Sequence, residues 1–232
     1  MSSSQASTPV AFSGLVSRLK VNGLEILGSL EVEEGEQLLP DRAAQPCMVA
    51  IIGNVGSAIW PPFERARQNR PGLTLDQWTE DVVGGIASDF GLDAVFPFQG
   101  PPYHPFIRWA KRTGNLFSSP LGLTIHPSFG LWHAFRAALL IDHTVDRPEA
   151  SAEHPCETCR DRPCLSACPV GAFGGDGYDF AACLDHVATP SNPCREGGCL
   201  ARIACPVGRR YRYREPHAAF HMQELLKAHG RT

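Results

Sequence analysis

The first two-thirds of the chain alternates between helically spaced apolar positions and short continuous apolar runs. Residues 12–30 keep helical spacing as far as Gly23 and then predict a strand over residues 24–30. The run CMVAIIGNVG, residues 47–56, stays apolar up to its closing glycines, which is typical of a buried strand. Helical spacing returns over residues 73–91, where a glycine marks the end of the predicted helix. A chain that switches between these two periods predicts a mixed fold of helices and strands.

The same alternation continues through the middle of the chain. LDAVFPF at residues 92–98 predicts another strand, residues 104–114 a short helix, and residues 121–127 a further strand. Residues 131–142 form an apolar run that suits a helix or a strand by periodicity, and we favour a strand. Residues 215–230 predict a last helix. The predicted fold class is therefore α/β, in the broad sense that includes α+β.

The composition changes after Asp146, from aliphatic residues to Cys, Pro, Gly and Arg. We expect a domain boundary over residues 147–153, because the later segment lacks the side chains of an ordinary core. An internal repeat supports this division, since CLSACPVGAF from Cys164 returns as CLARIACPVGRR from Cys199 with two extra residues. The predicted parts are an α/β domain over residues 1–148, a cysteine-rich domain over residues 149–215 and a C-terminal helix over residues 216–232.

Charge and hydropathy exclude several classes of protein. The formal net charge of −3 gives no basic footprint for a nucleic acid or an anionic membrane, so we expect neither partner. The polar N-terminus lacks the features of an export signal, and no stretch approaches the roughly 20 apolar residues that cross a bilayer. We therefore expect a cytoplasmic protein that works with small molecules or redox partners.

Eight of the nine cysteines fall between Cys156 and Cys205, which indicates metal binding rather than disulfides in a reducing compartment. The first four are separated by two, four and three residues, and a proline follows the last of them. This spacing is close to the bacterial ferredoxin motif, in which the fourth cysteine binds the neighbouring cluster. By that logic the segment is a ferredoxin-like domain with two [4Fe-4S] clusters. The first cluster takes Cys156, Cys159, Cys164 and Cys205, and the second takes Cys168, Cys183, Cys194 and Cys199.

Structural zinc is the alternative use of these cysteines, because two four-cysteine zinc sites would also consume eight of them. The Cys-Pro pair that closes both runs favours iron. Cys47 lies apart from the others in an apolar segment, where we expect a buried and inert thiol. GNVG at residues 53–56 is interpreted as a plain turn rather than a phosphate loop.

The segment before the cysteines carries a family resemblance. An electron carrier needs only the cysteine motifs, so a preceding domain suggests a site that receives electrons. GNLFSSPLGLTIHPSFGLWHAFRAALLID, followed by those motifs, resembles the end of the cobalamin-binding domain of epoxyqueuosine reductases and reductive dehalogenases. IHPSFGLWHAFRAALL is also similar to the matching segment of the CblC-type cobalamin-processing proteins, which lack the clusters. The resemblance implies a flavin-nitroreductase-like α/β domain followed by a ferredoxin-like domain.

The same resemblance implies a cobalamin site. In these relatives cobalamin lies between the α/β domain and the clusters, and backbone near the matching HPSFG turn lines the pocket. Arg136 matches an arginine that is associated with glutathione in the CblC-type segment. A flavin is the alternative occupant of such a domain. The implied cofactor-binding residues are Gly122, Thr124, His126, Pro127, Phe129, Gly130 and Arg136.

The chain departs from these relatives at the proton donor. Epoxyqueuosine reductases carry an acidic donor in a Val-Asp-Ser-Ala-Pro-like segment, whereas the corresponding AVFPFQGPPYHPF here has no carboxylate. Tyr103 or His104 is the candidate catalytic proton donor instead, since a tyrosine serves this purpose in reductive dehalogenases. The alternative is a structural tyrosine and a capping or surface histidine.

Other side chains also have simpler interpretations. His126 is more often a histidine that fixes a turn by hydrogen bonds than a cobalt ligand. Phe129 and Trp132 are interpreted as core or pocket wall rather than as stacking partners in catalysis. The run GRRYRYRE can stack on RNA and neutralise it, but a solvated or partner-docking face is the alternative that we favour.

These observations predict an iron–sulfur oxidoreductase whose two clusters deliver electrons to cobalt in a corrinoid-dependent or cobalamin-processing reaction. The expected partners are a corrinoid small molecule and a low-potential electron donor such as a ferredoxin or flavodoxin. The alternatives are a ferredoxin-like carrier or docking protein without corrinoid, and a flavin-binding reductase.

Overall fold

The computed structural model describes residues 8–33, 35, 36, 38, 39, 45–142, 152–174 and 177–231. Internal contacts divide the chain into two compact units. The first unit comprises Met1–Thr113 and Ala134–Glu149, and the second comprises Gly114–His133 and Ala150–Thr232. The predicted boundary over residues 147–153 lies almost wholly outside the described residues.

A four-stranded sheet organises the first unit, with the strand order β1-β2-β6-β3. Its strands are β1 (Leu24–Glu31), β2 (Met48–Val55), β3 (Asp93–Val95) and β6 (His133–Ile141). β1 pairs antiparallel with β2, and β3 pairs antiparallel with β6. All eight residues of β2 are buried, as expected of a central strand that is covered on both faces. The four strands predicted in these regions are confirmed, including the one favoured over residues 131–142.

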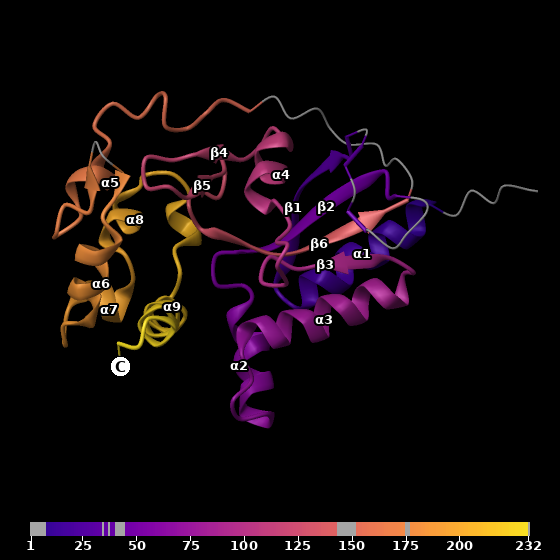
Figure 1. The fold of residues 1–232 in the computed structure, drawn as a ribbon, viewed down its shortest axis with the longest axis horizontal. Helices are drawn as coiled ribbons and strands as arrows, with labels where there is room; N and C mark the ends of the chain where they lie inside the picture. The colour runs from indigo at the N-terminus through magenta and orange to yellow at the C-terminus, as the bar shows by residue number, and fades with distance from the viewer. Residues whose placement is uncertain are drawn as a thin grey trace, which may run out of the picture. The chain divides into compact units, whose positions relative to one another are not determined.

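Helices cover both faces of this sheet. α1 (Thr8–Val21) and α3 (Leu75–Asp89) contact each other and the edge strands, and Figure 1 shows them on one face. α4 (Phe106–Arg112) packs on β1 and β2 from the other face. Gly28 allows this close approach, because a Cβ atom there would lie 2.8 Å from Thr113 Cβ. All three helices were predicted from apolar spacing and are confirmed.

Local sequence sets the starts of α2 (Trp60–Asn69) and α3. The hydrophobic pattern does not reveal α2, because only Trp60 and Phe63 are buried in it and it lacks an apolar stripe. Prolines occupy its first turn, where a missing N–H group costs no hydrogen bond. α3 begins with a capping box, in which the backbone N–H groups of Thr74 and Gln77 each donate to the other residue's side chain.

Two expectations for the region of β2 are wrong. Cys47 is exposed and precedes the strand, instead of lying buried within it. Its N–H donates to Ile141 O and its Sγ donates to Asp142 O, so the thiol lies beside the end of β6. GNVG is not a plain turn, because residues 53–55 belong to β2 and only Gly56, with a φ of 55°, turns the chain.

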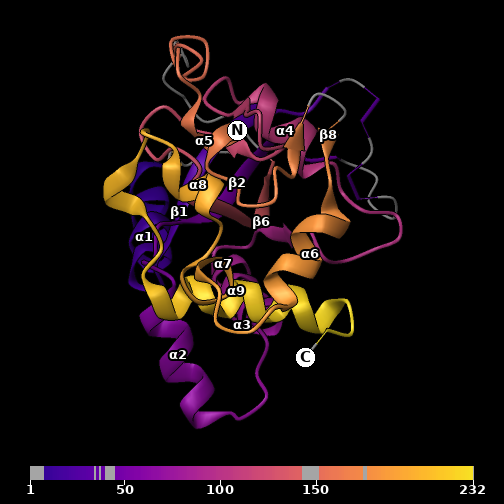
Figure 2. The ribbon, with the colours of Figure 1, turned by 90° about the vertical axis from the view of Figure 1, so that its left-hand side faces the viewer.

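The second unit is built from short elements. Its helices are α5 (Pro163–Ser166), α6 (Phe180–Ala188), α7 (Pro193–Gly197), α8 (Leu200–Ala204) and α9 (Glu215–Ala228), with a 3-10 turn η1 (Arg209–Tyr211). Two small sheets pair β4 (Phe117–Ser118) with β5 (Thr124–Ile125) and β7 (Phe173–Gly174) with β8 (Gly177–Tyr178). α6, α7 and α9 contact one another, as Figure 2 shows. Among the helices of the described residues, none is long and apolar enough to span a membrane.

Cysteines take the place of an ordinary core in the second unit. One hydrophobic cluster has the buried members Leu121, Ile125, Leu131, Cys164, Ala201 and Cys205. Residues 114–133, which we expected within the α/β domain, therefore pack with the cysteine-rich part of the chain. The strand predicted over residues 121–127 shrinks to the two residues of β5. α9 confirms the predicted C-terminal helix.

Candidate metal and cofactor sites

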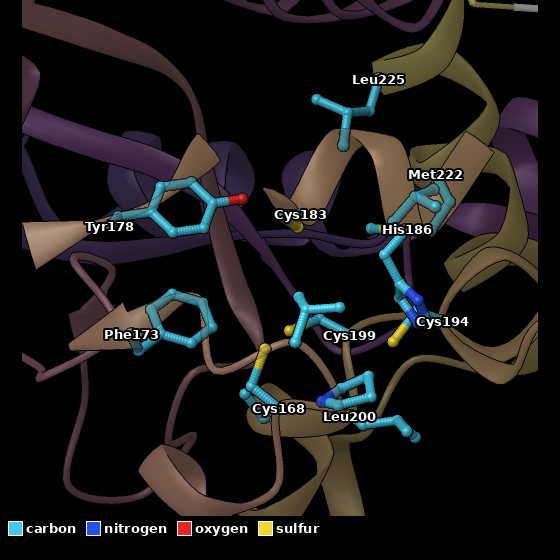
Figure 3. Close-up of a pocket in the computed structure, with 14 residues that line it drawn as sticks. Cys168, Phe173, Tyr178, Cys183, His186, Cys194, Cys199, Leu200, Met222 and Leu225 are labelled. Carbon is cyan, nitrogen blue, oxygen red and sulfur yellow. The ribbon is translucent and has the colours of Figure 1, made fainter. Parts of the chain in front are cut away.

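Four cysteines that are far apart in the sequence line one cavity of the second unit. We name this group site 2, and its members are Cys168, Cys183, Cys194 and Cys199. The cavity has a volume of about 80 Å³, and apolar side chains such as Phe173 and Met222 form much of its wall. Figure 3 shows the four sulfur atoms around the same space. The structure thus brings together the four cysteines that the sequence assigns to one cluster.

Four different elements present the cysteines of site 2. They are Cys168 after α5, Cys183 on α6, Cys194 on α7 and Cys199 just before α8. Backbone N–H groups donate to three of the four cysteines: Ala172 N–H to Cys168 Sγ at 3.3 Å, Leu200 N–H to Cys194, and the N–H groups of Ala201 and Arg202 to Cys199. Such donors stabilise the thiolate form, which is the form that binds metals.

Tyr178 and His186 add polar groups to the wall of this cavity. Burial, and then a hydrogen bond with Cys183, raises the pKa of Tyr178 above its ordinary value. The Tyr178 ring stacks on Phe173 with centroids 5.0 Å apart. His186 follows Cys183 by three residues on α6, and its Nε2 is buried without a hydrogen-bond partner among the described residues. The sequence-based predictions miss both residues, although the spacing Cys-x2-His on a helix signals His186.

Cys156, Cys159, Cys164 and Cys205 form the other group, which we name site 1. Burial, and then the charges of Cys205, Cys164 and Cys159, raises the pKa of Cys156 to about 11. Cys156, Cys164 and Cys205 also pack in one hydrophobic cluster, so these three thiols lie close together. α5 carries Cys164 and packs against α8, which ends before Cys205, so the two helices close the group.

Without metal, buried thiols in each site resist ionisation. Burial raises the pKa of every thiol in the set Cys164, Cys194, Cys199 and Cys205, and neighbouring cysteines add to it. Four thiolates can share such a site only when positive charge lies among them. Within the residues that the structure describes, no three His, Cys, Asp or Glu side chains are arranged to hold a single metal ion.

A tight turn from His126 to Gly130 follows β5. The two residues pair through their backbones, with N–H to O distances of 2.9 and 2.8 Å. His126 Nδ1 accepts from Ser128 N–H at 3.0 Å, and the His126 ring stacks on Phe129 with centroids 4.2 Å apart. Burial lowers the pKa of His126. His126 therefore fixes the turn by hydrogen bonds, which confirms the simpler of its two interpretations.

The turn is in backbone contact with the loop that follows Cys205. A Cβ atom on Gly130 would lie 2.1 Å from Val207 O, and one on Gly208 would lie 2.2 Å from Phe129 O. Both glycines also have positive φ angles, of 60° and 69°. Only glycine fits both positions, so the turn and the loop form one packed body.

His133 extends the polar contacts of this region. Its Nε2 lies 2.9 Å from Oγ1 of Thr124, and Gly122, with a φ of 73°, turns the chain just before Thr124. His133 is 6% exposed, and burial, followed by the charges of Arg202 and His126, lowers its pKa to about 4. It is therefore neutral at physiological pH. The sequence carries no signal for His133, because one histidine within an apolar run has no characteristic spacing.

The guanidinium group of Arg202 lies against two aromatic rings and binds the backbone at Leu131. Its Nε donates to Leu131 O at 3.1 Å, and its guanidinium lies 4.6 Å from the Trp132 ring and 4.4 Å from the Tyr213 ring. Trp132 is 3% exposed, as predicted for a core residue. Tyr211 meets Phe129 edge to face, with centroids 5.2 Å apart.

The run GRRYRYRE thus turns its tyrosines toward the fold. Both tyrosines make ring contacts within the second unit. The exposed residues of the run include Arg209, Arg210, Arg212 and Arg214. This arrangement favours a solvated or partner-docking face over a surface on which bases stack.

Three candidate residues lie in the first unit. Tyr103 is 64% exposed in the loop before α4. His104 stacks on Trp109 with centroids 5.5 Å apart, and burial lowers its pKa. Arg136, on β6, donates from Nε to Oδ1 of the buried Asn54 at 2.9 Å. Tyr103 and His104 are thus neighbours in one loop, whereas Arg136 belongs to the sheet.

These features define a class of protein: a mixed α/β unit around a four-stranded sheet, joined to a cysteine-rich unit. No protein-family model and no curated protein matches the chain. Several solved structures, however, have a similar fold. The B12-trafficking protein CblC of C. elegans, a homologue of human MMACHC, is 15% identical, with a TM-score of 0.50 over 92% of each chain.

Epoxyqueuosine reductases share this fold as well. The enzyme from Streptococcus thermophilus is 15% identical, with a TM-score of 0.54 over 89% of this chain and 68% of its own. A selenomethionine-labelled epoxyqueuosine reductase is 14% identical, with a TM-score of 0.51 over 90% and 68% of the two chains. At these identities the likeness establishes the fold alone. The resemblance noted in the sequence is confirmed at that level.

Proposed function

We propose that the chain is an iron–sulfur oxidoreductase that holds one [4Fe-4S] cluster at each cysteine site and passes electrons to a corrinoid. The observation that carries the proposal is the gathering of eight cysteines into two groups of four. Cys168 joins the later cysteines and Cys205 joins the earlier ones. This crossed pattern is the one found in two-cluster ferredoxins.

The residues at site 2 suit a cluster better than a zinc ion. Zn–S bonds are about 2.3 Å long, so four thiolates around one zinc ion leave no further space between them. The four cysteines of site 2 instead line a cavity of about 80 Å³. The apolar wall limits the access of water, and N–H donors to sulfur are a means by which proteins tune cluster potentials. The raised thiol pKa values indicate that positive charge is needed before four thiolates can coexist.

A corrinoid is the proposed electron acceptor because the chain shares its fold with a B12-trafficking protein. A bound corrinoid would supply a cobalt ion that takes up single electrons and exchanges a bound ligand. The residues of the second unit that are proposed to line its pocket are Gly122, Thr124, His126, Pro127, Phe129 and Gly130. The turn from His126 to Gly130 packs on the loop after Cys205, so site 1 and this turn share one core.

The chain's own side chains would orient the cofactor and supply protons. His126 is occupied by its turn hydrogen bonds and would not bind cobalt through Nδ1. His133 is neutral and would add no charge beside Thr124. Tyr103 or His104 would donate a proton, and the exposure of Tyr103 makes it accessible. A low-potential ferredoxin or flavodoxin would supply the electrons.

Anaerobic purification followed by iron, sulfide and zinc analysis tests the cluster proposal. We expect about eight irons per chain. Cys47→Ser is a matched control, because Cys47 is exposed and belongs to neither site, so its iron content should equal that of the unaltered protein. Zinc in place of iron would contradict the proposal.

Titration of the iron-loaded protein with hydroxocobalamin, followed by a reductant, tests the corrinoid proposal. A spectral shift to a base-off corrinoid, and its reduction through the clusters, is the expected result. Full iron content without any corrinoid response would leave a ferredoxin-like carrier. Release of a flavin on denaturation would instead indicate a flavin-binding reductase.

A further inference from the structure

We propose that His186 donates a hydrogen bond from Nε2 to the cluster at site 2 and raises the reduction potential of that cluster. The inference rests on the proposed function, because it needs a cluster among Cys168, Cys183, Cys194 and Cys199. His186 acts here through the cluster without ligating it. Its role is to stabilise the negative charge of the cluster, and the four cysteines remain the ligands.

The helix α6 presents His186 and Cys183 to the same cavity. The two residues are three positions apart, which puts their side chains on one face of the helix. Both side chains line the cavity of site 2. The backbone of His186 is fixed as well, because its C=O accepts from Asn192 Nδ2 at 2.8 Å and from Thr189 N–H at 3.1 Å. The imidazole thus has a defined place in the wall.

The unsatisfied atom of His186 points to an acceptor that belongs in the cavity. Nε2 is buried and has no hydrogen-bond partner among the described residues. A buried donor without a partner is costly, so native sites supply one from protein, water or ligand. Figure 3 shows the His186 ring on the Cys194 side of the space that the four sulfur atoms surround. Sulfide or thiolate sulfur of a cluster would satisfy this N–H group.

Cluster chemistry sets the direction of the effect. A [4Fe-4S] cluster with four thiolates gains negative charge on reduction, and a hydrogen-bond donor stabilises the more negative state. The donor therefore raises the reduction potential. Ligation by Nε2 is not needed, because four cysteines already line the cavity.

A redox titration of the full, anaerobically reconstituted chain, followed by electron paramagnetic resonance, tests the proposal. In His186→Leu, one of the two midpoint potentials should move to a more negative value while the other stays unchanged. His186→Gln retains an N–H donor and should restore part of the shift. His229→Leu is the matched control, because His229 is exposed and lies outside the cavity, and it should leave both potentials unchanged.

The iron content shows whether the cluster proposal or only the His186 proposal has failed. If the unaltered protein contains no iron, the proposed function itself fails. If His186→Leu keeps about eight irons and both potentials stay where they were, the hydrogen bond is absent while the clusters remain.

A second measurement uses the unaltered protein, so it does not depend on whether a variant folds. Pulsed electron paramagnetic resonance of the reduced protein, labelled with ¹⁵N-histidine, should detect a weak coupling to a histidine nitrogen. The strong coupling of a directly bound nitrogen would overturn the proposal in favour of ligation. The lack of any coupling would overturn it as well.

Discussion

One buried histidine of the second unit, His133, is held in its neutral form. His133 is deeply buried, and burial, followed by the charges of Arg202 and His126, lowers its pKa to about 4. The ordinary pKa of a histidine is about 6.5. Between these two values the unfolded chain binds a proton that the folded chain does not. Folding is therefore linked to pH through this one side chain.

The stability of the fold should fall as the pH drops from about 6.5 toward about 4. His133→Gln keeps a hydrogen-bonding group for Thr124 but cannot titrate. The free energy of unfolding of this variant should therefore fall by about 2 kcal/mol less than that of the unaltered protein when the pH drops from 7 to 5. Denaturant unfolding of both proteins at the two pH values measures this difference. Equal losses would show that His133 titrates with an ordinary pKa.

At the scale of elements, glycines decide how closely the turn at residues 126–130 approaches the loop after Cys205. Gly208→Ala places a Cβ atom 2.2 Å from Phe129 O in a backbone with positive φ. Gly91 is the matched control, because its φ of 65° is similar and a Cβ atom there would meet nothing within 4 Å beyond its chain neighbours. Both substitutions put an alanine at a positive φ angle, but only the one at Gly208 also brings a Cβ atom against backbone atoms.

We expect Gly91→Ala to cost about 1 kcal/mol of unfolding free energy, which is the strain of a positive φ alone. Gly208→Ala should cost clearly more, because backbone atoms must also move apart. Thermal or denaturant unfolding of the two variants gives the comparison. Similar losses for both would mean that the loop accommodates the methyl group without disturbing the turn.

The elements that sequence predicts well are those with local determinants. α3 has a capping box and a regular apolar stripe, and β2 is one continuous apolar run, so both follow from the residues alone. α2 was missed because its prolines and charged residues hide a helix that buries only two side chains. The strand expected over residues 121–127 shrinks to Thr124 and Ile125, which pair with β4, while Leu121 lies outside the strand and is buried in a cluster with Cys164 and Cys205.

At the scale of the whole molecule, the cysteine spacing predicts more than the hydrophobic pattern does. The ferredoxin-like motif predicts two groups of cysteines, and in the structure Cys168, Cys183, Cys194 and Cys199 line one cavity. The linear division into domains fails to anticipate that residues 114–133 join the cysteine-rich unit. That contact is formed between segments distant in sequence, and no local period of the chain encodes it. His133 escapes notice for the same reason.

The grouping of cysteines can be tested by pairs of substitutions. Cys156→Ser with Cys205→Ser removes two ligands from site 1 only, so about four irons should remain. Cys199→Ser with Cys205→Ser removes one ligand from each site, although these residues are close in sequence, and most iron should be lost. Iron analysis of the purified variants distinguishes the pairs. Equal iron in the two double variants would contradict the grouping.

The contact between the turn at residues 126–130 and the loop after Cys205 would couple the two proposed cofactors if both bind. Two ligands that bind to one packed body influence each other, and this influence is equal in both directions. A cluster that orders site 1 would favour corrinoid at the turn, and corrinoid at the turn would help to retain the cluster. The protein would then bind its cofactors cooperatively. Oxygen that destroys the cluster at site 1 would also weaken the binding of corrinoid.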